Sequence, residues 1–342
     1  MTKEEFEFIL FDRKEKIKQI NKEYDLENNA YISFSGGKDS TILHYLIDLA
    51  LPNNKIPRVF INTGIEYFDI VNFVKELSSN DDRIIIYNSG VNIKQMLEKY
   101  GYPFKSKQHS HNWEIYNNNK EECQKYISII KEDENKKKDY DFIHNLKKGV
   151  KTIIKYVFGI RERERESCTS TLIVPNKLKY QFERNYNGVK LSDKCCYKLK
   201  KEPIKKWEKQ NKRFIVITGM RAEEGGMRNQ NGCTIFEGDN LKKFHPLKVV
   251  SKEWQEQFIK NNNIKLSKLY YPPYNFARSG CRGCPFALDL QEQLDVMEKL
   301  LPNEKKQCET IWKPVYDEYR RVGYRLKKKN NQMTIFDFIE SD

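Results

Sequence analysis

The sequence predicts an α/β protein with a parallel sheet, helices on both faces of that sheet, and a cysteine-rich C-terminal region. Three short apolar runs at 30–35, 58–62 and 83–87 are typical of buried strands, and helical segments separate them. Continuous apolar strands that alternate with helices indicate a parallel sheet covered on both faces. A later apolar run at 213–219 repeats this pattern, so we expect it to join the same sheet.

Helices are predicted from apolar residues that recur at helical spacing. They are expected at 3–28, 41–50, 66–79 and 91–100. The segment 241–320 is expected to be mostly helical or irregular around a cysteine-rich turn. These patterns predict four parts of the chain. The first two are a nucleotide-binding part at 1–104 and a polar, charged, helical insertion at 105–190. The others are the remainder of the domain with its cysteines at 191–326 and a flexible tail at 327–342.

Composition limits the class of protein. Lys and Arg number 62 against 48 Asp and Glu, which gives a net charge of +14, and such a basic balance favours a polyanionic partner such as nucleic acid. No apolar run reaches the roughly 18 residues of a membrane span, so we expect no membrane partner. The N-terminal segment lacks the apolar stretch of a signal peptide, which predicts a cytoplasmic protein. Eight cysteines in a reducing compartment indicate a metal site or catalysis.

The segment SGGKDS at 35–40 lies between a predicted strand and a predicted helix. Gly36 and Gly37 permit a tight turn close to a ligand, and we expect positive φ at Gly37. The helix that follows points free N–H groups and its positive dipole end at an anion. Ser35 and Ser40 add hydroxyl donors, Lys38 adds a counter-charge, and Asp39 is expected to hold a metal or cap the helix. The spacing is neither that of a Walker loop nor that of a dinucleotide fingerprint.

SGGKDS resembles the PP-loop of the adenine-nucleotide α-hydrolases, which cleave ATP to AMP and pyrophosphate and have a Rossmann-like fold. Within that superfamily the chain resembles the phosphoadenosine phosphosulfate (PAPS) reductase family. Five further segments carry the resemblance, in the family's order: VFINTGIEY (59–67), KYGYPFKSK (99–107), KCCYKLKKEP (194–203), ITGMRAEEGGMR (217–228) and SGCRGCPF (279–286).

The resemblance implies an adenine nucleotide with Mg²⁺ across the carboxyl ends of the strands. Asn62, Thr63 and Gly64 end the second predicted strand and are expected to bind the nucleotide with the loop at 35–40. Arg221 follows the late strand, where a guanidinium suits a phosphate or sulfate group. Lys38, Asp39 and Arg221 are therefore the expected catalytic residues.

Four cysteines have the spacing of a metal site. A tandem pair, Cys195 and Cys196, is followed by Cys281 and Cys284 in a C-x-x-C segment. This arrangement resembles the iron–sulfur ligands of the adenylylsulfate reductases, and four thiolates suit a [4Fe–4S] cluster or structural zinc. Cys233 is a possible substitute for one of the tandem pair. The other cysteines are expected to be inert thiols, at positions 123, 168 and 308.

The chain lacks the C-terminal Glu-Cys-Gly-like segment that carries the nucleophilic cysteine of sulfonucleotide reductases. It resembles instead the ATP pyrophosphatases of the family that serve sulfur transfer to nucleic acid, as in DNA modification. The resemblance therefore implies an ATP pyrophosphatase that activates an acceptor for sulfur insertion, with a sulfur-donor protein as a further partner. A PAPS or adenylylsulfate reductase is the alternative. A third candidate is a non-catalytic, nucleotide-sensing regulator associated with DNA.

The tail carries Gln332, Met333, Thr334, Ile335 and Phe336 after a lysine run. This segment resembles the Q-L-x-L-F peptide that docks on bacterial sliding clamps, with one glutamine and two apolar anchors. An ordinary amphipathic terminus is the alternative interpretation. The sequence thus predicts a sliding clamp as a possible partner.

Overall fold

The computed structural model describes residues 1–160, 173–224 and 232–328. The chain forms two compact units, each built from two segments: unit 1 comprises 1–91 and 199–282, and unit 2 comprises 92–198 and 283–342. The predicted clamp peptide at 332–336 and Cys168 lie outside the described residues. None of the helices in the described ranges is long and apolar enough to cross a membrane.

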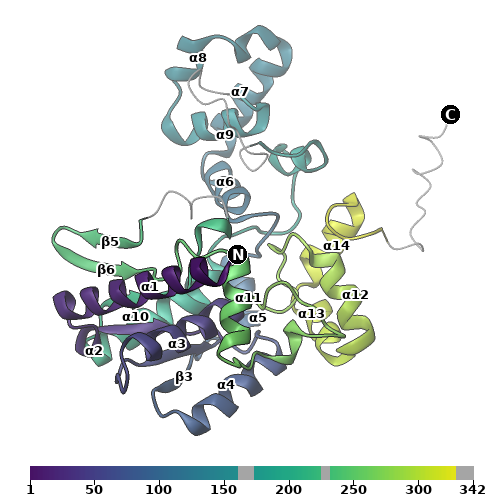
Figure 1. The fold of residues 1–342 in the computed structure, drawn as a ribbon. Coiled ribbons are helices and arrows are strands. Elements are labelled where there is room, and N and C mark those ends of the chain that lie inside the picture. The colour runs from purple at the N-terminus through teal and green to yellow at the C-terminus, as the bar shows by residue number, and fades with distance from the viewer. Residues whose placement is uncertain (161–172, 225–231, 329–342) are drawn as a thin grey trace. The chain divides into compact units, whose positions relative to one another are not determined.

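Unit 1 contains a six-stranded sheet in the order β3-β2-β1-β4-β6-β5. Figure 1 labels β3 and the hairpin of β5 and β6. Its strands are β1 (Ala30–Ser33), β2 (Arg58–Asn62), β3 (Ile84–Asn88), β4 (Ile215–Ile217), β5 (Thr234–Glu237) and β6 (Asn240–Phe244). Five of the strands run parallel, and β5 pairs antiparallel with β6 at the edge. The four strands predicted from the sequence are confirmed.

Helices cover both faces of this sheet, as predicted. Ile32 and Ile217 pack on one face with residues of α1 (Lys3–Tyr24), α3 (Lys38–Ala50) and α11 (Lys252–Asn261). Because side chains alternate along a strand, Tyr31 and Val216 point to the other face, where Trp207 of α10 (Glu202–Asn211) covers them. The unit also contains α2 (Leu26–Asn29) and α4 (Phe68–Asn80).

The prediction for residues after 241 was incomplete, because β6 joins the sheet there. The segment around Lys242 and Lys243 is polar and short, and it lacks the apolar run by which the other parallel strands were found. β6 forms because it pairs with both β4 and β5. Tertiary pairing therefore decides its conformation rather than local pattern.

Unit 2 is helical in the described residues. Its first segment contains α5 (Ile93–Tyr100), α6 (Lys107–Asn118), α7 (Lys120–Glu132), α8 (Tyr140–His144), α9 (Lys148–Phe158) and the 3-10 helix η3 (Asn176–Phe182). Its second segment contains α12 (Leu290–Leu300), α13 (Pro302–Ile311) and α14 (Lys313–Val322). A buried aromatic group around Tyr156 and Phe182 joins α6, α9 and η3.

Candidate functional site

The loop at 35–40 connects the end of β1 to the start of α3, as the sequence predicts; we call it the phosphate loop. Gly36 adopts φ +67°, which L side chains rarely adopt, and a Cβ there would lie 2.7 Å from Val74 Cγ2. Gly37 is the N-cap residue of α3 with φ −81°. The expectation of positive φ at Gly37 is therefore wrong, since Gly36 makes the left-handed turn. Gly37 is instead crowded, because its Cβ would meet hydroxyl oxygens of Ser279, Ser35 and Tyr270 at 3.0–3.2 Å.

The two serines of the phosphate loop bond to each other. Ser40 Oγ donates to the Gly37 carbonyl at 2.9 Å and accepts from the Ser35 N–H at 3.2 Å. A hydroxyl has one proton, so Ser35 Oγ is the donor in the 3.0 Å contact between the two hydroxyl groups. Both hydroxyl protons are thus engaged within the loop, and the serines fix its shape.

Some backbone N–H groups of the loop have a hydrogen-bond partner and others do not. The N–H of Lys38 donates to the Tyr270 hydroxyl at 3.2 Å. Within the ranges that the structure describes, the N–H groups of Gly36, Asp39 and Ser40 have no hydrogen-bond partner, and the Lys38 ammonium group has no carboxylate partner. Three unpaired amides at a helix N-terminus beside an ammonium group form a cradle suited to a phosphate group.

Asp39 and Arg221 lie together beside this cradle. Arg221 Nε is 3.3 Å from Asp39 Oδ1, and Gln255 Nε2 donates to the same oxygen at 2.7 Å. Close contact between α3 and the segment after β4 brings the pair together, because a Cβ on Gly219 would lie only 2.7 Å from the Asp39 carbonyl oxygen. Arg221 is 9% exposed and also pairs with Glu223. Its guanidinium is therefore oriented by carboxylates near the phosphate loop.

The end of β2 forms a tight turn held by a buried glutamate. The Thr63 hydroxyl donates to the carboxylate of Glu66, and the Thr63 N–H donates to Glu66 Oε2 at 3.0 Å. Lys200 Nζ lies 3.6 Å from Glu66 Oε1. Asn62 is more exposed; its side-chain oxygen accepts from the Gly64 N–H at 3.2 Å. The predicted segment 62–64 thus forms a turn at the carboxyl edge of the sheet. The N–H and hydroxyl groups of Thr63 are both engaged by Glu66 within this turn.

The cysteines with metal-like spacing belong to both units. Cys195, Cys196 and Cys284 belong to unit 2, whereas Cys281 belongs to unit 1, where its backbone bridges to Glu66. The donor set consists of thiols alone, which fits a soft metal or an iron–sulfur cluster. The substitute ligand Cys233 lies in unit 1, where its thiol donates to the His245 carbonyl at 3.2 Å.

Side chains of helix α14 form hydrogen bonds with the backbone on both sides of Cys284. The Tyr316 hydroxyl donates to the Gly283 carbonyl at 2.5 Å, and the Tyr319 hydroxyl donates to the Pro285 carbonyl at 2.9 Å. Arg325 Nη1 donates to the same Pro285 oxygen at 2.6 Å. Gly283 has φ +58°, and a Cβ there would lie 2.8 Å from the Cys308 sulfur. Cys308 is fully buried in α13, so it packs behind the loop that carries Cys284.

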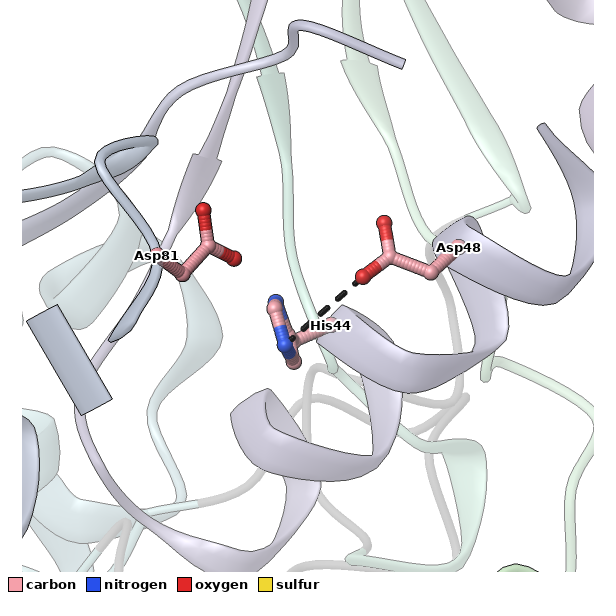
Figure 2. Close-up of side chains that lie close together, drawn as sticks. All are labelled: His44, Asp48 and Asp81. Carbon is pink, nitrogen blue, oxygen red and sulfur yellow. Dashed lines mark ion pairs between the residues drawn. The ribbon is translucent and has the colours of Figure 1, made fainter. Parts of the chain in front are cut away.

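A second polar cluster lies in unit 1. Figure 2 shows His44 and Asp48 on α3 with Asp81 opposite, and the ligand atoms of these three residues lie within 4.8 Å of one another. Arg58 is fully buried and donates to His44 Nδ1 at 3.1 Å and to Asp48 Oδ1 at 2.6 Å. Arg83 donates to both carboxylates. Two guanidinium groups thus compensate the two carboxylates, and the cluster is an ion network of the fold rather than a metal site.

Charge and burial shift the pKa values in this network. Burial, reinforced by the charge of Arg58, lowers the pKa of His44 to about 4. Burial alone would raise the pKa of Asp48, but hydrogen bonds from Arg83 and the charge of Arg58 lower it. His44 is therefore neutral at pH 7 and accepts the Arg58 hydrogen bond through Nδ1.

Sequence reasoning missed four residues that support the phosphate loop and its neighbouring turn: Glu66, Gln255, Tyr270 and Ser279. Tyr270 is linked to Lys38 and to Ser279, whose Oγ lies 2.5 Å from the Tyr270 hydroxyl. The contacts that Tyr270 and Gln255 make with the first turn of α3 join segments more than 200 residues apart in the chain, so no local pattern predicts these two residues. Two of the four, Glu66 and Ser279, stand inside segments that carry the family resemblance, which is the one signal that pointed to them.

A family model and a curated relative match the chain in sequence. Residues 29–166 and 140–287 match the family model of the phosphoadenosine phosphosulfate reductase domain. Over 103 residues the chain is 35% identical to an uncharacterized protein of Methanocaldococcus jannaschii, a match that covers 28% of the chain and 25% of the relative. The chain thus spans about a quarter of that relative's length.

Two solved structures align with the chain at low similarity. One is a phosphoadenylyl-sulfate reductase from Candida auris, with 12% identity, a TM-score of 0.39, and coverage of 79% of this chain and 91% of the other. The second is the U34-tRNA thiolase NcsA from Methanococcus maripaludis with its [4Fe-4S] cluster, with 13% identity, a TM-score of 0.35, and coverage of 95% and 82%. The residues matched by the family model include the phosphate loop, the turn after β2 and Arg221. They also include the four cysteines with metal-like spacing, at positions 195, 196, 281 and 284.

Proposed function

The chain belongs to the phosphoadenosine phosphosulfate reductase domain family, and from this premise we propose that it binds ATP at the phosphate loop and cleaves it to AMP and pyrophosphate. An acceptor forms a bond to the α-phosphorus while the bond to the α–β bridging oxygen breaks. Pyrophosphate leaves with that oxygen, and the AMP moiety stays on the acceptor. Release of AMP by a sulfur nucleophile would then insert sulfur into the acceptor, with the sulfur supplied by a donor protein.

The unpaired donors at the N-terminus of α3 carry this proposal. Gly36, Asp39 and Ser40 offer backbone N–H groups in the described part of the loop, and Lys38 offers an ammonium group without a carboxylate partner. Backbone donors fixed before the reaction stabilise the charge that develops on a leaving pyrophosphate. Mg²⁺ would enter with the nucleotide as part of the substrate and offset further charge.

Arg221 and the turn after β2 complete the proposed site. Asp39 and Glu223 hold the Arg221 guanidinium in ion pairs, and a guanidinium in this setting suits the oxygens of a phosphate. Asn62, Thr63 and Gly64 end β2, and carboxyl ends of parallel strands are the usual position of a nucleotide. We assign Asn62 and Gly64 to nucleotide binding, with Thr63 shaping their turn through Glu66. We assign Lys38, Asp39 and Arg221 to catalysis.

We further propose that Cys195, Cys196, Cys281 and Cys284 hold a [4Fe–4S] cluster. The all-thiol donor set supports this assignment, and structural zinc is the alternative for the same donors. When bound, the cluster would supply a low-potential or sulfur-binding iron centre. The residues of the chain would fix its position, with Tyr316 and Tyr319 holding the backbone beside Cys284.

Incubation of anaerobically purified protein with ATP, PAPS and adenylylsulfate tests the reaction. Pyrophosphate release from ATP is the expected result. Sulfite release from either sulfonucleotide would instead support the reductase, although Cys308 is fully buried. Nucleotide binding without turnover of any of the three would identify a regulator and overturn the proposal.

A further inference from the structure

A face of α10 carries exposed lysines that the proposed reaction does not use. Lys201 is the N-cap residue of α10, and Lys212 is its C-cap residue. Positions 201, 205, 209 and 212 recur at intervals of four and three residues, which places them on one side of the helix. The side chains at these four positions are exposed, and we call them the lysine face: Lys201, Lys205, Lys209 and Lys212.

Most lysines of the lysine face have no carboxylate partner within the described residues. Some lysines on other helices pair with nearby carboxylates, as in Lys18 with Glu15, Lys252 with Glu256 and Lys313 with Asp317. Within the described residues, three lysines of the face make no ion pair: Lys201, Lys209 and Lys212. An uncompensated row of like charges repels itself, and a polyanion relieves that repulsion.

The packing of α10 on the sheet leaves the lysine face exposed to solvent. Trp207 packs on Tyr31 and holds the opposite side of the helix against the sheet, so the lysine face points to solvent. Phe214 is 52% exposed. Since Val216 points to the α10 side of the sheet, Phe214, two residues earlier, lies on that side too. The lysine face therefore has an exposed aromatic ring beyond its C-terminal end.

We propose that the lysine face of α10 and Phe214 bind a single-stranded nucleic acid. Lysines along a helix contact successive phosphates, and an exposed aromatic ring stacks on a base that is not already paired. Charge complementarity therefore selects the backbone, and Phe214 selects a single strand over a duplex. The face begins beside Lys200, which pairs with Glu66 at the end of β2, so a strand bound there reaches the carboxyl edge of the sheet. Binding of a strand to the lysine face does not require the chemistry proposed for that edge.

Fluorescence anisotropy with a labelled single-stranded DNA, titrated at several salt concentrations, measures this binding. Lys201→Gln/Lys209→Gln/Lys212→Gln should reduce the slope of log K against log salt by about 2, since each lost contact to a single strand contributes roughly 0.7. Phe214→Ala should weaken binding about tenfold while the slope stays unchanged, because stacking releases no counterions. RNA of the same sequence should bind equally, because neither lysine nor stacking reads the 2′-hydroxyl.

The matched control is Lys14→Gln/Lys18→Gln/Lys22→Gln on α1, which removes the same charge at i, i+4 and i+8. It should keep the wild-type slope. Equal losses in both triple variants would mean that net charge alone attracts the strand, and a duplex that binds as tightly as the single strand would remove the role of Phe214. Either result, or no binding by the wild type, overturns the proposal. Pyrophosphate release without nucleic acid should be the same in all these variants, so failure here is separable from failure of the proposed reaction.

Discussion

The carboxylate of Asp39 lies 3.3 Å from the guanidinium of Arg221 and thereby joins the first turn of α3 to the segment after β4. Two residues predicted to be catalytic from separate motifs are neighbours in unit 1. The pair has a consequence for charge, since Asp39 and Glu223 offset the guanidinium before any nucleotide is bound. These two ion pairs hold the Arg221 guanidinium in position before a nucleotide binds. A phosphate that binds to Arg221 must compete with the two carboxylates.

Arg221→Gln should lower pyrophosphate release by about 10²–10³, the usual effect of removing one donor aimed at developing charge. The measurement is the turnover number with saturating ATP, and ATP affinity should change less than turnover. Arg320→Gln is the control, because Arg320 is similarly buried and paired with Glu309 but belongs to unit 2. Equal losses in the two variants would assign Arg221 a purely structural role.

Gly36 and Gly37 should respond differently to alanine. Gly36→Ala combines φ +67° with a Cβ 2.7 Å from Val74, so we expect it to destabilise unit 1 by about 1–3 kcal/mol. Gly37→Ala has an ordinary φ of −81° and should cost less than about 1 kcal/mol, while its methyl group displaces the loop hydroxyls and weakens ATP binding. Denaturant midpoints and ATP titration measure the two effects.

Gly238→Ala separates backbone strain from crowding in this series. Gly238 has φ +60°, and a Cβ there has no atom within 4 Å. Its variant should therefore show only the backbone cost of roughly 1 kcal/mol. If Gly36→Ala is no worse than Gly238→Ala, the contact with α4 does not constrain the phosphate loop.

Anaerobically purified protein should be brown and contain about four irons per chain, as a Cys₄-bound cubane requires. Cys284→Ser should lose most of the iron and the visible absorption. Cys308→Ser is the matched control, because this thiol packs against the same loop from α13 and should keep its iron. Stoichiometric zinc without iron in the wild type would move the site to the structural-zinc assignment, and iron loss in both variants would mean that packing rather than ligation is measured.

The parts predicted well from the sequence are those that a local pattern determines. β1, β2 and β3 follow continuous apolar runs, and the phosphate loop follows from two glycines between a strand and a helix. β6 was missed because its conformation depends on pairing with β4 and β5. Gln255 and Tyr270 were missed for the same reason, since each reaches the loop through a contact across more than 200 residues.

The network around His44 makes stability depend on pH. The pKa of His44 is lowered to about 4 from 6.5, so the unfolded chain takes up a proton before the folded chain does. The stability from this residue is complete above pH 6.5 and is lost as pH falls from 6.5 to about 4. A difference of that size corresponds to about 3 kcal/mol. Burial lowers the pKa of His109 to about 3 and the pKa of His245 to about 4. Both residues therefore also make the folded chain less stable as the pH falls.

His44→Asn keeps an acceptor for Arg58 and removes the titrating imidazole, so it should flatten the loss of stability between pH 6.5 and 4. Asp48 affects stability at lower pH than His44 does, because its pKa is lowered from an ordinary value of 3.8. Its titration therefore does not account for a loss of stability between pH 6.5 and 4. The measurement is the denaturant midpoint of unit 1, followed by the fluorescence of Trp207 or Trp254, at a series of pH values. His144→Asn removes an exposed imidazole of unit 2 and should leave the slope of unit 1 unchanged. An unchanged slope in His44→Asn would show that His44 does not stay neutral in the folded state, and the hydrogen bond that Arg58 donates to Nδ1 would then have to be reassigned.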